Sequence, residues 1–311
     1  MRPLRHWYVA LVLALGMTAA AAAAQGTQLV VVKNGVASLA TLSGAVGQVI
    51  ATGGIRGASV SPAGTLWLAN RPSERELSSL NPDYRPYMCG FTRVVWPWPS
   101  TPVDIGAVGA TWPAKIVGDA SPSPPEMPTC EIAATPEDAL AFTRMPVGSG
   151  TRSLVLRPST TDGSFAVSSL GCGWSVTFSA PGGPVACLYH AQMGWGSAGY
   201  RVFTGQLNHV RGASSRQQSA TGAGISPDGR RVVLLSDSGV ITVAKTNGRQ
   251  ARRIGTVRGA RGRVLWTPDG TTIIIRAGSS LWKMAVSGRR PPVRFMSGVD
   301  DVAVMPQGLA P

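Results

Sequence analysis

The feature that most constrains this chain is a segment that occurs twice near the C-terminus. Residues 225–235 read ISPDGRRVVLL and residues 266–275 read WTPDGTTIII, and the prolines Pro227 and Pro268 are 41 residues apart. In each copy proline fixes the first corner of a turn, aspartate accepts backbone hydrogen bonds, and glycine takes positive φ. A β-branched apolar run follows each turn, so each copy predicts a β-hairpin.

Two more strand-like runs follow each hairpin. In the first unit they are Val240–Lys245 and Gln250–Thr256, joined by an Asn-Gly turn signal. In the second unit they are Leu281–Val286 and Pro292–Met296, joined by Ser-Gly. Four short strands in about 40 residues are typical of a β-propeller blade.

Weaker copies of the turn extend this repeat along the chain. They are centred on Pro62, Pro136, Pro181 and Pro306. Together with the two strong copies they predict six blades, although the long step from Pro62 to Pro136 leaves room for a seventh. We favour an insertion at about residues 97–136 there, because this stretch holds nine of the 24 prolines.

The two ends of the chain complement each other. The last anchor, Pro306, comes with only one strand-like run, Asp301–Met305, so three strands of that blade are missing. Three such runs precede the first anchor: Gln28–Val32, Ala37–Leu42 and Gln48–Ala51. We therefore predict that the N-terminal strands complete the last blade and close the ring. The 38 glycines and 24 prolines exclude a fold of long helices. The expected fold is one all-β propeller domain over residues 25–311.

These repeats resemble a known family. The S/T-P-D-G hairpin, the following LW or ITV run and the GRxxRRI segment are similar to the TolB-like, WD-like propeller repeats of exported bacterial proteins. The similarity is specific for residues 221–296 and weak for residues 71–170. It implies an exported propeller that serves as a protein-binding platform.

The first 24 residues read as a secretory signal peptide. Arg2 and Arg5 precede an apolar run and an alanine tract that ends at Ala24, as in a signal with an A-x-A cleavage site. We expect cleavage, an extracytoplasmic (secreted or periplasmic) location and no membrane span afterwards; an uncleaved anchor is the alternative.

An exported chain with an even number of cysteines usually oxidises them in pairs. The sequence order suggests Cys89 with Cys130 and Cys172 with Cys187, although three pairings can be drawn. Free thiols and a zinc site are the alternatives. No C-x-x-C pair favours a metal, and we expect none.

Positive charge is concentrated in one part of the chain. The net charge is +14, and residues 201–294 hold 17 basic and three acidic residues. In the hairpin register, Arg230, Arg231, Arg249, Arg289 and Arg290 fall beside turns at one face. They predict binding of an acidic protein or an anionic envelope polymer, and generic surface charge is the alternative. Nucleic acid is not expected, because no recognition helix or stacking motif accompanies them.

Motifs for chemistry are scarce in this sequence. There is no H-E-x-x-H, no G-x-S-x-G and no calcium-loop pattern. The loop that contains His190, Trp195 and Tyr200 is the best candidate for a small-ligand pocket. We expect no catalytic residues, no metal and no cofactor.

The combined interpretation is a monomeric, non-catalytic propeller that binds a protein or an anionic cell-envelope component. The alternatives are a propeller enzyme of lactonase, lyase or glycosidase type with its site at the channel mouth, and a propeller whose partner domain is encoded elsewhere.

Overall fold

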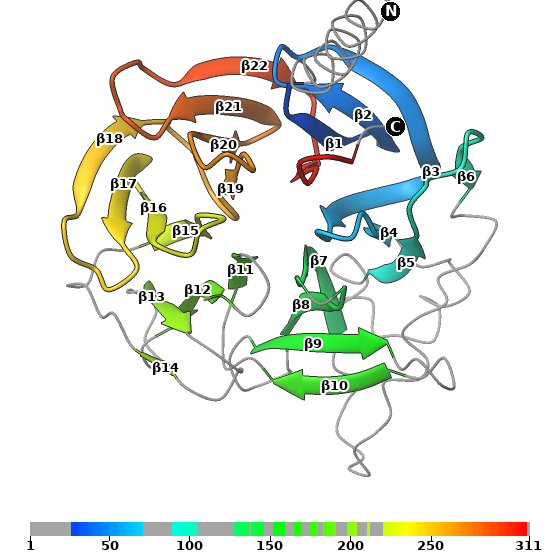
Figure 1. Cartoon of the computed structure of the whole chain (residues 1–311), viewed down its shortest axis with the longest axis horizontal. Coiled ribbons are helices and arrows are strands. Elements are labelled where there is room, and N and C mark those ends of the chain that lie inside the picture. Colours follow the sequence, from blue (N-terminus) through cyan, green and yellow to red (C-terminus); the bar gives the residue numbers. More distant parts are fainter. Residues whose placement is uncertain are drawn as a thin grey trace, which may run out of the picture.

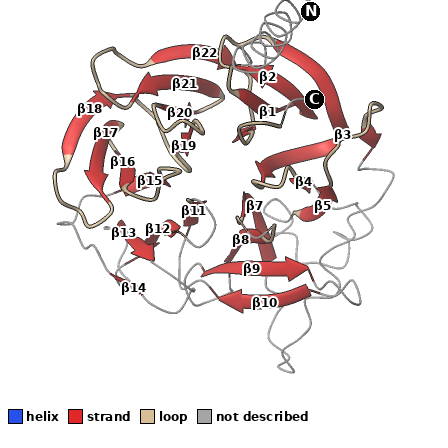
Figure 2. Cartoon of the chain, in the orientation of Figure 1, coloured by secondary structure: helices blue, strands red, loops and turns tan. Residues whose placement is uncertain are grey.

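The computed structural model describes residues 26–70, 89–104, 127–136, 138–145, 152–158, 165–169, 174–179, 183, 185–190, 198–203, 210–211 and 220–309. Regular structure in these ranges is all β, and no helix occurs in them. None of these segments could therefore span a membrane as a helix. The sheets are arranged around a common centre (Figure 1), and Figure 2 shows the same strands coloured by type.

Two complete four-stranded sheets are formed by the C-terminal part of the chain. Each is an antiparallel meander in sequence order. The first contains β15 (Ala220–Ile225), β16 (Arg231–Ser236), β17 (Val240–Lys245) and β18 (Arg252–Thr256). The second contains β19 (Leu265–Trp266), β20 (Thr272–Ala277), β21 (Ser280–Ala285) and β22 (Val293–Ser297).

The middle of the chain forms two further four-stranded antiparallel sheets. One contains β7 (Met127–Ala134), β8 (Leu140–Met145), β9 (Arg152–Pro158) and β10 (Phe165–Ser169). The other contains β11 (Trp174–Phe178), β12 (Val185–His190), β13 (Ala198–Phe203) and β14 (Val210–Arg211).

The two ends of the chain meet in a seven-stranded sheet of order β23-β1-β2-β3-β4-β5, with β6 beside β3. C-terminal β23 pairs antiparallel with N-terminal β1, with Val31 opposite Val302. The strands are β1 (Gln28–Lys33), β2 (Gly35–Thr41), β3 (Val46–Val60), β4 (Leu66–Asn70), β5 (Gly90–Val94), β6 (Val103–Asp104) and β23 (Asp301–Val304).

Strand β3 has 15 residues and belongs to two parts of this sheet. Its first half pairs with β2, and its second half, from Ile55 to Val60, pairs with β4. The sequence predicted a strand only at Gln48–Ala51, so this prediction was too short. Glycines in the run TGGIRG hid the second half, because glycine weakens a strand pattern.

Burial decreases from the inner strands to the outer ones. Val232–Leu235 in β16 and Ile273–Ile275 in β20 are buried, and both stretches are continuous apolar runs. Continuous apolar runs of this kind are typical of strands that are buried on both faces. By contrast, β18 and β22 are largely exposed and contain arginines. The core therefore lies between neighbouring sheets.

The two strong repeats form the predicted turn. Asp228 Oδ1 accepts hydrogen bonds from Ser226 Oγ (2.5 Å) and from the Arg230 N–H (3.1 Å), and Gly229 has φ of 68°. In the second copy, Asp269 Oδ1 accepts from the Thr267 hydroxyl (2.5 Å) and from the Thr271 N–H (3.1 Å). In both copies the aspartate side chain thus stabilises the turn that contains it.

Neighbouring sheets approach each other closely at two glycines of β15. A Cβ atom at Gly222 would lie 2.1 Å from the Gly262 carbonyl oxygen, and one at Gly224 would lie 1.9 Å from that of Val264. The same backbones are hydrogen-bonded, since Val264 N–H donates to the Ala223 carbonyl at 2.9 Å. Only glycine permits this contact.

The all-β prediction is confirmed, and most predicted strands agree with the structure to within two residues at each end. Residues 1–25 and most of the proline-rich stretch lie outside the described residues, so the signal peptide and the insertion stay predictions. Cys89 and Cys187 are fully buried and neither is a free thiol. Cys172 and the Cys130 side chain are not described, so the pairing stays a prediction.

Candidate functional site

A central cavity is lined by one strand from each four-stranded sheet and by two strands from the seven-stranded sheet. Its volume is about 330 Å³, and its walls come from β3, β7, β11, β15, the segment before β19, and β23. The turn prolines Pro62, Pro136, Pro227, Pro268 and Pro306 all line it. These five proline anchors therefore gather around one opening, which we call the proline mouth; the sixth, Pro181, lies outside the described residues.

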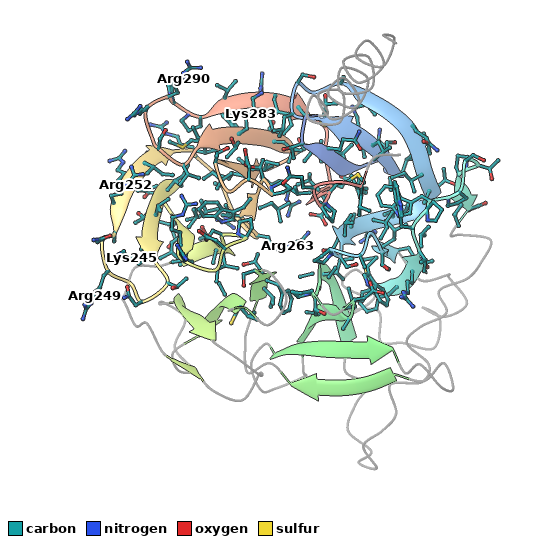
Figure 3. All side chains as sticks on the ribbon, in the orientation of Figure 1. Lys245, Arg249, Arg252, Arg263, Lys283 and Arg290 are labelled. Atoms are coloured by element: carbon teal, nitrogen blue, oxygen red, sulfur yellow. The ribbon has the colours of Figure 1, made fainter. Side chains whose placement is uncertain are left out.

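Arg263 is one of the residues that line this cavity. It lines both the proline mouth and a second cavity of about 300 Å³ on the other side. Its guanidinium donates to the Ile132 carbonyl, to the Ala58 carbonyl at 3.3 Å, and to both carboxylate oxygens of Asp301 at 3.1 and 3.3 Å. Asp301 Oδ2 also accepts from the Ala58 N–H at 3.0 Å. One arginine thus joins β3, β7 and β23 at the centre (Figure 3).

The second cavity has a charged wall, and we call its opening the arginine mouth. Arg56, Arg263 and Arg276 line it together with Asp300 and Asp301. Arg276 Nη1 donates to the Asp300 carbonyl oxygen at 2.6 Å. Arginine is therefore in excess over aspartate at this opening.

Several of the basic residues counted in the sequence link neighbouring sheets. Arg231 donates to the Gly270 carbonyl at 3.0 Å and its guanidinium lies 5.1 Å from the centre of a Trp266 ring. Arg252 donates to the Val286 and Ser287 carbonyls at 2.8 and 3.1 Å, and Lys283 donates to the Leu42 carbonyl at 2.7 Å. Part of the basic excess therefore supports the fold.

The remaining predicted arginines are exposed at one end of the strands. Arg230 follows the β15–β16 turn, Arg249 lies in the β17–β18 turn, and Arg289 and Arg290 lie in the β21–β22 connection. With the exposed Lys245 they form what we call the basic rim: Arg230, Lys245, Arg249, Arg289 and Arg290. Figure 3 shows Lys245, Arg249 and Arg290 at the periphery of their sheets.

Topology and hydrogen bonds place these turns side by side. In an antiparallel meander, the β15–β16 and β17–β18 turns lie at the same end of the sheet. The Thr246 N–H donates to the Arg230 carbonyl at 3.0 Å, which joins the two turns. Arg252 reaches the connection that contains Ser287 in the next sheet. The basic rim therefore extends across two sheets.

Two acidic side chains lie at the same end of the strands, Asp228 in the β15–β16 turn and Asp269 in the β19–β20 turn, and both have lowered pKa values. Burial raises the pKa of Asp228, but hydrogen bonds from Ser226 and Arg230 and the charges of Arg231 and Arg230 outweigh it. Burial also raises the pKa of Asp269, but hydrogen bonds from Thr267 and Thr271 outweigh this effect and lower it. Both carboxylates are engaged in their turns and stay ionised at neutral pH.

The predicted ligand residues lie at one hairpin, but only partly within the described chain. His190 ends β12 and is opposite Ala198 of β13, while Tyr200 is opposite Leu188. Trp195 falls in the connection, outside the described residues. The placement of these three as a pocket therefore stays a prediction.

Within the described ranges, no group of three or more histidine, cysteine, aspartate or glutamate side chains could hold a metal ion. Among the described acidic residues, Asp138 accepts from Ser61 Oγ at 2.9 Å and pairs with Arg93. Asp300 Oδ2 accepts from the Asn34 N–H at 2.9 Å. These carboxylates join neighbouring segments of the chain.

The radial sheets and the central cavity define the fold as a β-propeller of TolB-like type. Similar solved structures include TolB from Acinetobacter baumannii, with a TM-score of 0.59 and 13% identity over 90% of this chain. The chain spans 66% of the length of that protein.

Two other solved structures have nearly the length of this chain. Putative TolB from Agrobacterium tumefaciens has a TM-score of 0.53 and 12% identity, covering 90% of this chain and 97% of its own. A putative 6-phosphogluconolactonase from Bacteroides fragilis has a TM-score of 0.50 and 13% identity, covering 91% and 98%. No family model and no curated protein matches the sequence. These likenesses concern the fold alone.

Proposed function

We propose that this chain is a six-bladed propeller whose ring is closed by strands from both termini. The support is the pairing of β1 with β23 and the six segments that line the central cavity. The closing blade would combine β23, β1, β2 and the first half of β3. The next blade would begin with the second half of β3, so that one strand would link two blades.

We further propose that it acts outside the cytoplasm as a monomeric, non-catalytic binding platform. Its partner would be an acidic protein surface or an anionic envelope polymer, bound at the basic rim. The observation that carries this proposal is that Arg230, Lys245, Arg249, Arg289 and Arg290 are all exposed across two adjoining sheets. The acidic groups in the turns at this end of the strands, Asp228 and Asp269, are occupied by hydrogen bonds. Such a surface raises the local concentration of anions.

The test compares two double variants of equal charge. Arg249→Gln with Arg290→Gln removes two rim charges, while Arg258→Gln with Arg261→Gln removes two exposed charges from the β18–β19 connection at the opposite end of the strands. Binding to poly-L-glutamate and to purified teichoic acid is measured at low and high salt. We expect the rim variant to lose roughly tenfold in affinity at low salt, since each exposed charge contributes about 1 kcal/mol or less.

The two probes separate the two kinds of partner, because one is a polypeptide and the other is a wall polymer. The proposal fails if neither probe binds the unaltered protein at low salt. It also fails if both double variants lose affinity equally, because the effect would then reflect net charge and not the basic rim.

The enzyme alternative would place its site at the arginine mouth. The Bacteroides structure with the same fold is described as a putative 6-phosphogluconolactonase, and Arg56 and Arg276 could hold an anionic substrate. Hydrolysis of a sugar lactone by the purified protein would favour this alternative over the binding platform.

A further inference from the structure

A cleft that is separate from the basic rim lies beside the arginine mouth. Its volume is about 680 Å³, which is in the range of small-molecule sites. Its walls come from the β1–β2 turn, the middle of β3, the β20–β21 turn and the segment before β23. We call it the arginine cleft, because Arg56 and Arg276 line both it and the arginine mouth.

A β-bulge places Arg56 in this cleft. In the pairing of β3 with β4, Ile55 is opposite Asn70 and Gly57 is opposite Ala69, so Arg56 has no residue opposite it. Bulges re-aim a side chain and are frequent beside functional sites. Gly53 and Gly54 precede it with φ of 107° and 75°. The backbone here therefore departs from a regular strand where the cleft begins.

Arg276 and Asp300 are held in place on the facing wall. Arg276 Nη1 donates to the Asp300 carbonyl oxygen at 2.6 Å, and Asp300 Oδ2 accepts the Asn34 N–H at 2.9 Å. Asn34 and Gly35 have φ of 52° and 76°, as in the tight two-residue turn that joins β1 to β2. The β1–β2 hairpin thus holds the Asp300 carboxylate, while Arg276 holds the Asp300 backbone.

Arg276 retains capacity for a ligand. A guanidinium has five N–H donors in a planar fork. The one hydrogen bond from Arg276 to Asp300 leaves further N–H donors of Arg276 for a ligand. Arginine forks bind carboxylate and phosphate groups with two hydrogen bonds each.

The charge and shape of the walls indicate what could bind. Arg56, Arg276 and Asp300 line the cleft, while the nearby Asp301 is already paired with Arg263. No heavy atom would lie within 4 Å of a Cβ at Gly54 or Gly278, so the backbone there borders open space. Ser279 and Asp300 are exposed and can bond hydroxyl groups.

We propose that the arginine cleft binds a small, hydroxylated organic anion. Its carboxylate or phosphate group binds between Arg56 and Arg276, and its hydroxyl groups bind Asp300 and Ser279. This inference does not depend on the basic rim, which lies at the opposite end of the strands.

The test is calorimetric titration of the whole protein with three probes: D-glucuronate, glucose 6-phosphate and glucose. We expect at least one of the two acidic sugars to bind at least tenfold more tightly than glucose, and the stronger of the two identifies a carboxylate or a phosphate ligand. Arg56→Gln should weaken that binding roughly tenfold or more, because a charged hydrogen-bonding partner is lost. Arg258→Gln, an exposed change in the connection before β19, should weaken it less than twofold.

Arg276→Gln serves as a second variant, and thermal unfolding confirms that each variant is folded. The proposal is overturned if neither acidic sugar binds, or if glucose binds as well as they do. It is equally overturned if folded Arg56→Gln and Arg276→Gln proteins both bind as tightly as the Arg258→Gln control.

Discussion

Replacement of Arg263 by methionine should be among the most destabilising single changes in this chain. The arginine side chain is 7% exposed, and it donates to two carbonyl groups and to the carboxylate of Asp301. Methionine keeps the apolar stem but removes every one of these hydrogen bonds. Asp301, 18% exposed, would keep only the Ala58 N–H as a described partner.

The expected magnitude follows from the charge that is left behind. Breaking a buried ion pair by removing one partner costs about 3–5 kcal/mol, because the other charge stays desolvated. For a domain of this size, that loss corresponds to a decrease of roughly 10 °C in the unfolding midpoint. Urea denaturation with an unchanged m-value would show that the loss is one of stability and not of cooperativity.

Arg261→Met is the matched control, because Arg261 is exposed and lies two residues earlier in the same connection. A cycle with Asp301→Asn measures the coupling between the two charged groups. The reasoning is refuted if the free energies of unfolding of the Arg263 and Arg261 variants differ by less than about 0.5 kcal/mol, which is the usual range of surface substitutions.

Two further predictions concern ring closure and acid stability. Val31 and Val302 are register partners, so cysteines at both positions should form a disulfide within the monomer and raise the free energy of unfolding by about 4 kcal/mol; absence of that cross-link in non-reduced peptide maps would contradict closure. The pKa values of Asp228 and Asp269 are lower in the folded state, so their stabilising contribution is present above the unfolded pKa of about 3.9 and is lost as the pH falls through the folded value. Denaturation curves should therefore lose stability below about pH 4, and an equal acid loss in the Asp228→Asn, Asp269→Asn variant would contradict this.

The local elements of the fold could be predicted from the sequence because each is encoded by neighbouring residues. The turn at Asp228 needs only Ser226, Gly229 and the following N–H group, all within five positions. The strand Val240–Lys245 was predicted with its observed bounds. Even the pairing of the two chain ends could be inferred, by counting the strands missing after Pro306.

The candidate sites were only partly foreseen. The exposed positions of Arg230, Arg249, Arg289 and Arg290 follow from the turn register. For Arg231 the same register predicted a binding residue, whereas the structure shows it bonded to Gly270 and stacked on Trp266. Nothing local distinguishes Arg231 from Arg230, because its partners lie in the next repeat.

The sequence alone determined an all-β chain of repeated hairpins with a basic C-terminal part, since turn chemistry and apolar runs act over a few residues. Only the tertiary structure decided where Arg263 and Arg56 lie. Arg263 contacts residues 38, 131 and 205 positions away. Arg56 lies at a β-bulge in a strand that could not be predicted, because its glycines weaken the strand pattern. Contacts between sheets join distant parts of the chain, and they exist only once the sheets have packed around a common centre.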